Sequence, residues 1–182
     1  MRKLIGVLVS GNGTNLQALI DAGLPVTAVA SNRKEAYALQ RAREAGVPTA
    51  TFSMDCHESR EERDLVMAMW LEEHGVELVV LAGYMHLLTE PFLRRFPERI
   101  VNVHPSLLPA FPGAHAIDDA LEAGIDTTGV TVHLVDAGLD TGPVLVQEEI
   151  AVEPRDTLEE RIHAVEHRLL PKVVKDLCLA AR

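Results

Sequence analysis

An amide and an imidazole that could act on the same oxygen atom lie two residues apart, at Asn102 and His104. Alternate side chains of a β-strand point to the same face, so both groups would lie together at the carboxyl end of a strand. Two such donors can stabilise the oxyanion that forms during acyl transfer. Pro105 and Pro109 restrict the loop that follows. A histidine that simply bonds to the backbone is the alternative interpretation.

A carboxylate that could act with this pair is Asp140, which lies between Gly138 and Gly142. An aspartate beside His104 would orient the imidazole and favour its protonated form. A glycine-rich hairpin with a solvated aspartate explains the same residues more simply. The residues alone leave both interpretations open.

The glycine-rich loop Ser10–Asn15 joins an aliphatic run to a helical pattern. Glycines let the backbone approach an anion, and the N–H groups at the start of a helix favour phosphate. Leu16 replaces the third glycine of a dinucleotide fingerprint, and no Walker-type lysine follows. The loop predicts a mononucleotide-type phosphate site, with a plain turn before a helix as the alternative.

Two further motifs carry charge. His163, Glu166 and His167 match the H-x-x-E-H pattern of a class of zinc peptidases. No persuasive carboxylate ligand follows downstream, and the charge of Arg168 would oppose a cation, so we expect no metal site here. Glu166 could instead bind a different ligand. Arg60, near the start of a predicted helix, is either a solvated charge or the arginine that a phosphate pocket needs.

The elements that must position these residues follow from hydrophobic periodicity. Strands are predicted over 4–9, 25–30, 49–52 and 78–82, and helices over 15–22, 35–45 and 58–74. This alternation predicts an α/β fold with a mostly parallel, twisted sheet and helices on both faces. Ligands of such sheets bind beyond the carboxyl ends of the strands. The loops 10–15, 83–88 and 102–109 follow such ends.

The C-terminal part has a different pattern. Strands over 129–135 and 143–150 flank the Asp140 loop, and a helix follows over 157–179. Pro171 inside that helix predicts a kink or a break. In the helix over 58–74, the apolar spacing predicts that Leu65, Met69 and Trp70 face the core.

Composition limits the function classes. The 182 residues correspond to one domain, and the net charge of −10 argues against nucleic acid or an anionic membrane as a partner. No apolar stretch approaches the roughly 20 residues that span a bilayer. Two widely separated cysteines favour a reduced environment. We therefore expect a cytoplasmic protein. The sequence leaves a monomer and a homodimer equally open.

Together these motifs closely resemble the phosphoribosylglycinamide formyltransferase family, the folate-dependent transformylases of purine synthesis. The resemblance extends over about 3–174 and rests on seven motifs, at 10–15, 59–60, 82–85, 102–109, 112–115, 129–135 and 139–143. It implies a Rossmann-like formyltransferase fold over 1–182. Residues to about 100 would bind phosphate, and those from about 101 would carry catalysis and folate binding.

The resemblance also implies an activity, the transfer of a formyl group from 10-formyltetrahydrofolate to the amine of glycinamide ribonucleotide. Asn102, His104 and Asp140 would be the catalytic trio. The folate would be consumed as a co-substrate, and no metal would be required.

Three further groups of residues take roles by the same resemblance. Those expected to bind the ribonucleotide are Gly13, Thr14, Asn15, Arg60 and Glu166. Those expected to line the folate site, together with Asn102 and Asp140, are Met85, His86, Leu87, Leu88 and Val135. Those expected to support the site from behind are His115, Thr131 and His133.

Two positions depart from the family pattern. His86 stands where arginine is common, which affects the contact to the glutamate tail of folate, and Thr141 stands where glycine is common. Three alternatives stay open: formyltetrahydrofolate hydrolase, methionyl-tRNA formyltransferase, and a non-catalytic nucleotide- or folate-binding protein. The first two relatives carry an additional domain, and turnover would distinguish the third.

Overall fold

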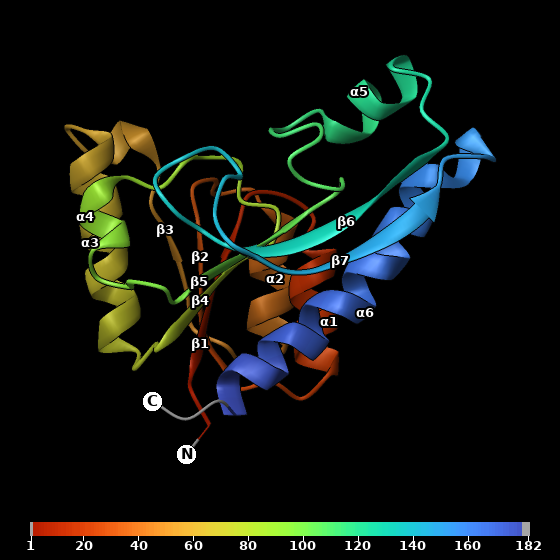
Figure 1. Ribbon diagram of the computed structural model, residues 1–182. Coiled ribbons are helices and arrows are strands. Elements are labelled where there is room, and N and C mark those ends of the chain that lie inside the picture. Colours follow the sequence, from red (N-terminus) through yellow and green to blue (C-terminus); the bar gives the residue numbers. More distant parts are fainter. Residues whose placement is uncertain (1, 180–182) are drawn as a thin grey trace.

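A single mixed sheet forms the centre of the computed structural model, which describes residues 2–179 (Figure 1). Its strand order is β3-β2-β1-β4-β5-β6-β7. The strands are β1 (Ile5–Val9), β2 (Val26–Ser31), β3 (Thr49–Thr51), β4 (Leu78–Leu81), β5 (Ile100–His104), β6 (Thr127–Leu134) and β7 (Val144–Ala151). The first five strands pair in parallel, while β6 and β7 are antiparallel. The expected fold class is confirmed.

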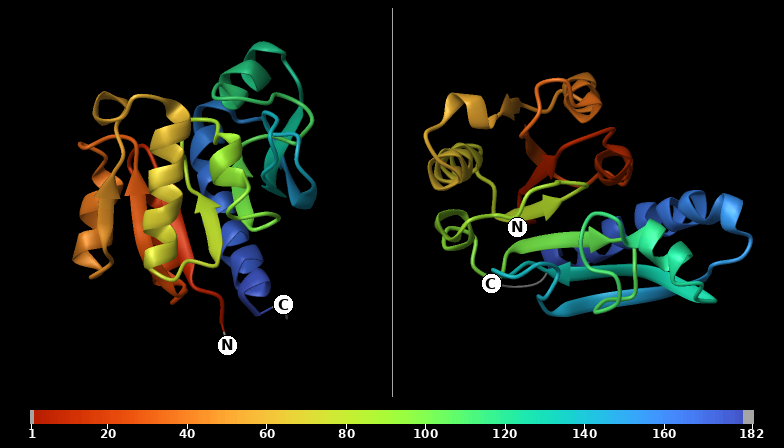
Figure 2. Two further views of the ribbon diagram at one scale, coloured as in Figure 1. Left: turned by 90° about the vertical axis from the view of Figure 1, so that its left-hand side faces the viewer. Right: turned by 90° about the horizontal axis from the view of Figure 1, so that it is seen from above.

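Helices cover both faces of this sheet (Figure 2). The helices are α1 (Thr14–Asp21), α2 (Tyr37–Glu44), α3 (Arg60–Glu73), α4 (Glu90–Leu93), α5 (Ala116–Glu122) and α6 (Leu158–Leu179), with short 3-10 turns η1 (Met54–Cys56) and η2 (Arg155–Thr157). One face packs against α1, α2 and α6, and the other against α3 and α4. The sequence did not predict α4 and α5, because so few turns show no helical period.

Strand alternation explains how the core divides into two layers. In β1, Ile5, Val7 and Val9 belong to the layer with α1 and α6, whereas Leu8 belongs to the layer with α3. Gly6 lies in the same strand, and a Cβ atom there would come 2.9 Å from Leu71 of α3. Both faces of β1 are therefore buried, as the dense aliphatic run predicts.

The buried face of α3 differs from the predicted one. Leu65 and Met69 are 37% and 45% exposed, so the expectation that they face the core is wrong. Trp70, the third residue expected there, is half-buried and packs against the core. The buried residues are Arg63, Asp64, Met67, Ala68 and Leu71. Arg63 and Asp64 form an ion pair that allows two charged side chains to occupy the inner stripe.

Helix α6 closes the fold by returning to the start of the chain. Of the kink or break predicted at Pro171, the break does not occur, because the helix is continuous through this residue. Near its end, the carbonyl oxygen of Cys178 accepts a hydrogen bond of 3.2 Å from the Lys3 N–H. Within residues 2–179, none of the helices has the length and apolar character needed to cross a membrane.

Candidate active site

The carboxyl end of β5 brings the predicted amide and imidazole together. Antiparallel pairing with β6 places His133 opposite Asn102 and Thr131 opposite His104. Asn102 Nδ2 lies 3.2 Å from Nε2 of His133 and 3.3 Å from Oδ1 of Asp140. The sheet register therefore brings Asn102 and His104 together with two predicted supporting residues, and the contact with Asn102 adds Asp140.

Asp140 reaches this cluster from the segment that joins β6 to β7. Its backbone is left-handed, with φ 53°. Oδ2 accepts a hydrogen bond of 2.8 Å from the Gly113 N–H and lies 3.5 Å from Nδ1 of His104. Oδ1 lies 3.6 Å from Nε2 of His133. Both carboxylate oxygens thus face donors, and the carboxylate has a fixed orientation.

The electrostatics of this cluster favour an ionised Asp140. Burial has the largest effect and opposes ionisation, but the contact with His133, the Gly113 N–H and the charge on His104 together lower the pKa of Asp140 below its ordinary value. Nε2 of His104 lies 2.8 Å from the carbonyl oxygen of Phe111, while Nδ1 faces Asp140. The Nε2–H group therefore donates to the Phe111 carbonyl oxygen, and Nδ1 is directed toward the carboxylate without reaching hydrogen-bond distance.

His133 orients the Asn102 amide. Nδ1 of His133 lies 2.8 Å from the carbonyl oxygen of Leu134 and donates to it. Nε2 lies 3.2 Å from Asn102 Nδ2 and 3.6 Å from Asp140 Oδ1. The Asn102 amide nitrogen therefore lies between the Asp140 carboxylate, to which it donates, and the His133 ring.

A hydrogen-bonded network behind the cluster fixes the loop that follows β5. Thr131 Oγ1 donates to the carbonyl oxygen of Ser106 at 2.7 Å and accepts from the Leu108 N–H at 3.1 Å. Gln147 Nε2 donates to the Leu108 carbonyl oxygen at 2.8 Å and to Thr131 Oγ1 at 2.9 Å. Sequence reasoning missed Gln147, because a polar residue on an edge strand gives no distinct signal.

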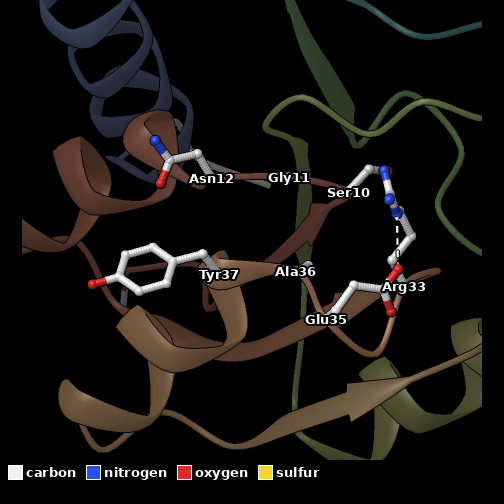
Figure 3. Close-up of a pocket in the computed structure, with 7 residues that line it drawn as sticks. All are labelled: Ser10, Gly11, Asn12, Arg33, Glu35, Ala36 and Tyr37. Atoms are coloured by element: carbon white, nitrogen blue, oxygen red, sulfur yellow. Dashed lines mark hydrogen bonds and ion pairs between the residues drawn. The ribbon is translucent and has the colours of Figure 1, made fainter.

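The predicted phosphate loop has the geometry of a helix start. Gly13 is the N-cap of α1 with φ 77°, and a Cβ atom there would lie 2.5 Å from Cβ of Ala38. The Arg41 Nε–H donates to the Asn12 carbonyl oxygen at 2.9 Å, a brace that the sequence did not reveal. Surface hollows flank the loop, one lined by Ser10, Gly11, Asn12, Arg33, Glu35, Ala36 and Tyr37 (Figure 3) and another by Thr14, Gln17, Ala18, Asp21, Arg41 and His167.

Two predicted ribonucleotide residues from distant parts of the sequence meet beside this loop. Asn15 Nδ2 donates to Oε2 of Glu166 at 3.0 Å, and both side chains are buried. Burial raises the pKa of Glu166, and the hydrogen bond from Asn15 only partly opposes it. Asn15 Oδ1 is buried without a protein partner. Across 2–179, no three His, Cys, Asp or Glu side chains are arranged to hold a metal ion.

The predicted folate residues form an apolar rim. Met85 and Leu87 are 60% and 48% exposed, whereas Leu88 is buried and packs in the same core layer as Val135. Burial and the charges of Arg63 and Arg60 lower the pKa of His86, so this side chain is neutral at physiological pH. The departure at His86 therefore removes a positive charge from the rim.

Two predicted residues lie away from the expected contacts. Arg60 Nη2 donates to the Leu87 carbonyl oxygen at 2.7 Å, which places the guanidinium at the loop 83–88. No contact recorded in the described chain joins it to 13–15, so its role at the phosphate stays a prediction. His115 is exposed at the start of α5, and its supporting role likewise stays a prediction.

Comparison with known proteins gives consistent matches over nearly the whole chain. A family model described as formyl transferase matches residues 3–174. The chain is 45% identical over 179 residues to phosphoribosylglycinamide formyltransferase of Mycobacterium tuberculosis, a match covering 94% of this chain and 83% of that protein. The crystal structure of glycinamide ribonucleotide transformylase 1 from Symbiobacterium toebii matches with a TM-score of 0.92 and 47% identity, covering 96% of this chain and 86% of that one.

A longer relative matches over the same region. The trifunctional purine biosynthetic protein adenosine-3 of Drosophila melanogaster is 44% identical over 184 residues, which cover 95% of this chain. The chain spans only 14% of the length of that relative.

Proposed function

The chain belongs to the formyl transferase family, and on this premise we propose that it transfers the formyl group of 10-formyltetrahydrofolate to the amine of glycinamide ribonucleotide. The main structural support for this proposal is that Asn102, His104 and Asp140 lie together at the carboxyl end of β5. The similarity to phosphoribosylglycinamide formyltransferases supports the choice of substrates. The reaction is a step of purine synthesis, in which folate is a co-substrate and the protein needs no metal.

The trio acts on the oxygen and the protons of the reaction. The amine attacks the formyl carbon, and the carbonyl oxygen becomes an oxyanion that accepts hydrogen bonds from His104 and Asn102. The His104 Nδ1–H group lies 3.5 Å from Asp140, longer than a hydrogen bond, so this donor is available to the formyl oxygen. Asp140 keeps His104 charged and passes a proton, through water, from the amine to the departing folate nitrogen.

The remaining residues bind the two substrates. Gly13, Thr14 and Asn15 hold the phosphate with help from Arg60, and Glu166 accepts hydrogen bonds near the ribose. The exposed apolar side chains of Met85 and Leu87 lie against the folate. His86, Leu88 and Val135 complete that site, and His115, Thr131 and His133 support it. The unpaired cysteines, Cys56 and Cys178, are consistent with a reduced cytoplasmic location.

An absorbance assay with 10-formyltetrahydrofolate tests the proposal. Release of the deformylated folate should depend on added glycinamide ribonucleotide. Equal release without the ribonucleotide would make the protein a hydrolase. Folate binding without any release would place it among non-catalytic binding proteins.

A further inference from the structure

The loop 83–88 is held by side chains rather than by backbone pairing. Within the described chain, no hydrogen bond to another backbone group is recorded for its residues. Three side chains fasten it instead. The Met85 N–H donates to Ser10 Oγ at 2.9 Å, the Leu87 carbonyl oxygen accepts from Arg60 at 2.7 Å, and the N–H of the adjoining Thr89 donates to Asp64 Oδ2 at 2.8 Å.

The anchor at Asp64 is a buried ion pair. The side chains of Arg63 and Asp64 have no solvent exposure. Arg63 donates from Nε and Nη2 to Oδ1 of Asp64, at 2.9 and 2.6 Å, and so leaves Oδ2 for the Thr89 N–H. Arg63 Nη1 is buried without a partner. Buried ion pairs add little stability over an apolar pair of similar volume, so stability alone does not explain this one.

What the pair supplies is an acceptor with a fixed position and direction. The two donors of Arg63 hold Oδ1, and α3 carries both residues on a packed element. Asp64 therefore fixes the chain at Thr89, which follows the loop and takes the N-cap position of α4.

The anchor at Ser10 fixes the loop at Met85. Ser10 is almost fully buried at the end of β1, and its hydroxyl donates to Asn32 Oδ1 at 2.6 Å. That bond directs the hydroxyl hydrogen away from the loop and leaves an oxygen lone pair for the Met85 N–H.

From these contacts we propose that Ser10 and Asp64 are positioning residues for folate recognition. They fix the backbone at Met85, within the loop, and at Thr89, just after it, and so hold the side chains of Met85 and Leu87 outward as an apolar platform for the aromatic rings of folate. A loop ordered in advance loses less conformational entropy when the ligand binds. The inference rests on the proposed function, because that function assigns the loop to folate.

The test compares binding of tetrahydrofolate and of glycinamide ribonucleotide by calorimetry. Ser10→Ala removes one anchor. The double variant Arg63→Met with Asp64→Leu removes the other without leaving a buried charge. Each should weaken tetrahydrofolate binding about tenfold, the order expected for loss of one fixed hydrogen bond, and change ribonucleotide affinity less than about twofold. Equal losses for both ligands, or no loss for tetrahydrofolate, would overturn the proposal.

Three controls separate positioning from folding. Asn32→Ala removes the acceptor of the Ser10 hydroxyl and should weaken tetrahydrofolate binding, whereas Asn32→Asp keeps an acceptor and should restore it. Ser53→Ala, in the connection between β3 and α3, should bind as the unaltered protein does. A loss of tetrahydrofolate affinity in Ser53→Ala equal to that in Ser10→Ala would contradict the proposal.

Hydrogen exchange measured without ligand distinguishes this proposal from the proposed function. The Met85 amide should lose protection in Ser10→Ala, and the Thr89 amide should lose it in the double variant. Unchanged protection would show that the anchors do not hold the loop. Lost protection in a protein that binds no tetrahydrofolate would instead refute the folate assignment and leave the anchoring intact.

Discussion

Among single residues, we expect His104 to have the largest effect on catalysis. Its ring is held between the Asp140 carboxylate and the Phe111 carbonyl oxygen. His104→Ala should lower kcat about 10²-fold or more, as loss of an oxyanion donor does, while ribonucleotide affinity stays nearly unchanged. Steady-state kinetics and calorimetry measure the two quantities. His74→Ala, at the far end of α3, is the matched control and should keep kcat. A near-normal rate for His104→Ala would remove the assigned role.

Glu166 links binding to the pH dependence of stability. Its pKa is raised in the folded protein, so the protonated carboxyl is favoured there and stability declines as pH rises from about 4.5 through the folded pKa. Glu166→Gln keeps an acceptor for Asn15 but cannot ionise. As pH rises from acid to neutral, the free energy of unfolding of this variant should therefore increase relative to that of the unaltered protein. The ribonucleotide affinity should fall about tenfold.

Urea unfolding at acid and neutral pH checks this expectation. Glu160→Gln, an exposed position on the same helix, serves as the control and should show no such gain. A constant difference in unfolding free energy across this pH range would show that burial of Glu166 does not disfavour its charge.

At the scale of elements, the turn from β1 into α1 requires a glycine at one position and not at its neighbour. Gly13→Ala forces an L-residue into positive φ and brings Cβ within 2.5 Å of Ala38, so it should lower the free energy of unfolding by about 1–3 kcal/mol and weaken ribonucleotide binding. Gly11→Ala is the control, because no atom lies within 4 Å of its added Cβ. Equal unfolding free energies for the two variants would contradict this reading of the turn.

The elements also show what the sequence could predict. The alternation of aliphatic runs and helical patterns predicted the sheet, and the spacing of Asn102 and His104 correctly placed them together at a strand end. The buried face of α3 was predicted wrongly. Arg63 and Asp64 are buried there because they form an ion pair with each other, and the spacing of apolar residues cannot predict such a pair. The anchors at Ser10 and Asp64 could not be predicted from the sequence either, because each contact depends on the position of a loop that is distant in the chain.

At the scale of the whole molecule, the sites depend on contacts between distant parts of the chain. Glu166 of α6 meets Asn15 of α1, and α6 also packs on the sheet. We therefore propose that residues 1–182 unfold as one cooperative domain. Thermal unfolding followed by Trp70 fluorescence, which reports on the α3 layer, and by circular dichroism should give a single coincident transition. Two separate transitions would divide the chain into independent units.

The most direct test of the account follows the fate of the formyl group itself. The protein is mixed with glycinamide ribonucleotide and 10-formyltetrahydrofolate that carries an isotope-labelled formyl carbon, and the products of a single turnover are identified by mass spectrometry. We predict that the label appears on the ribonucleotide, and that Asp140→Asn, which retains the shape of the carboxylate, abolishes the transfer. Label recovered as free formate, with the ribonucleotide unchanged, would contradict the account.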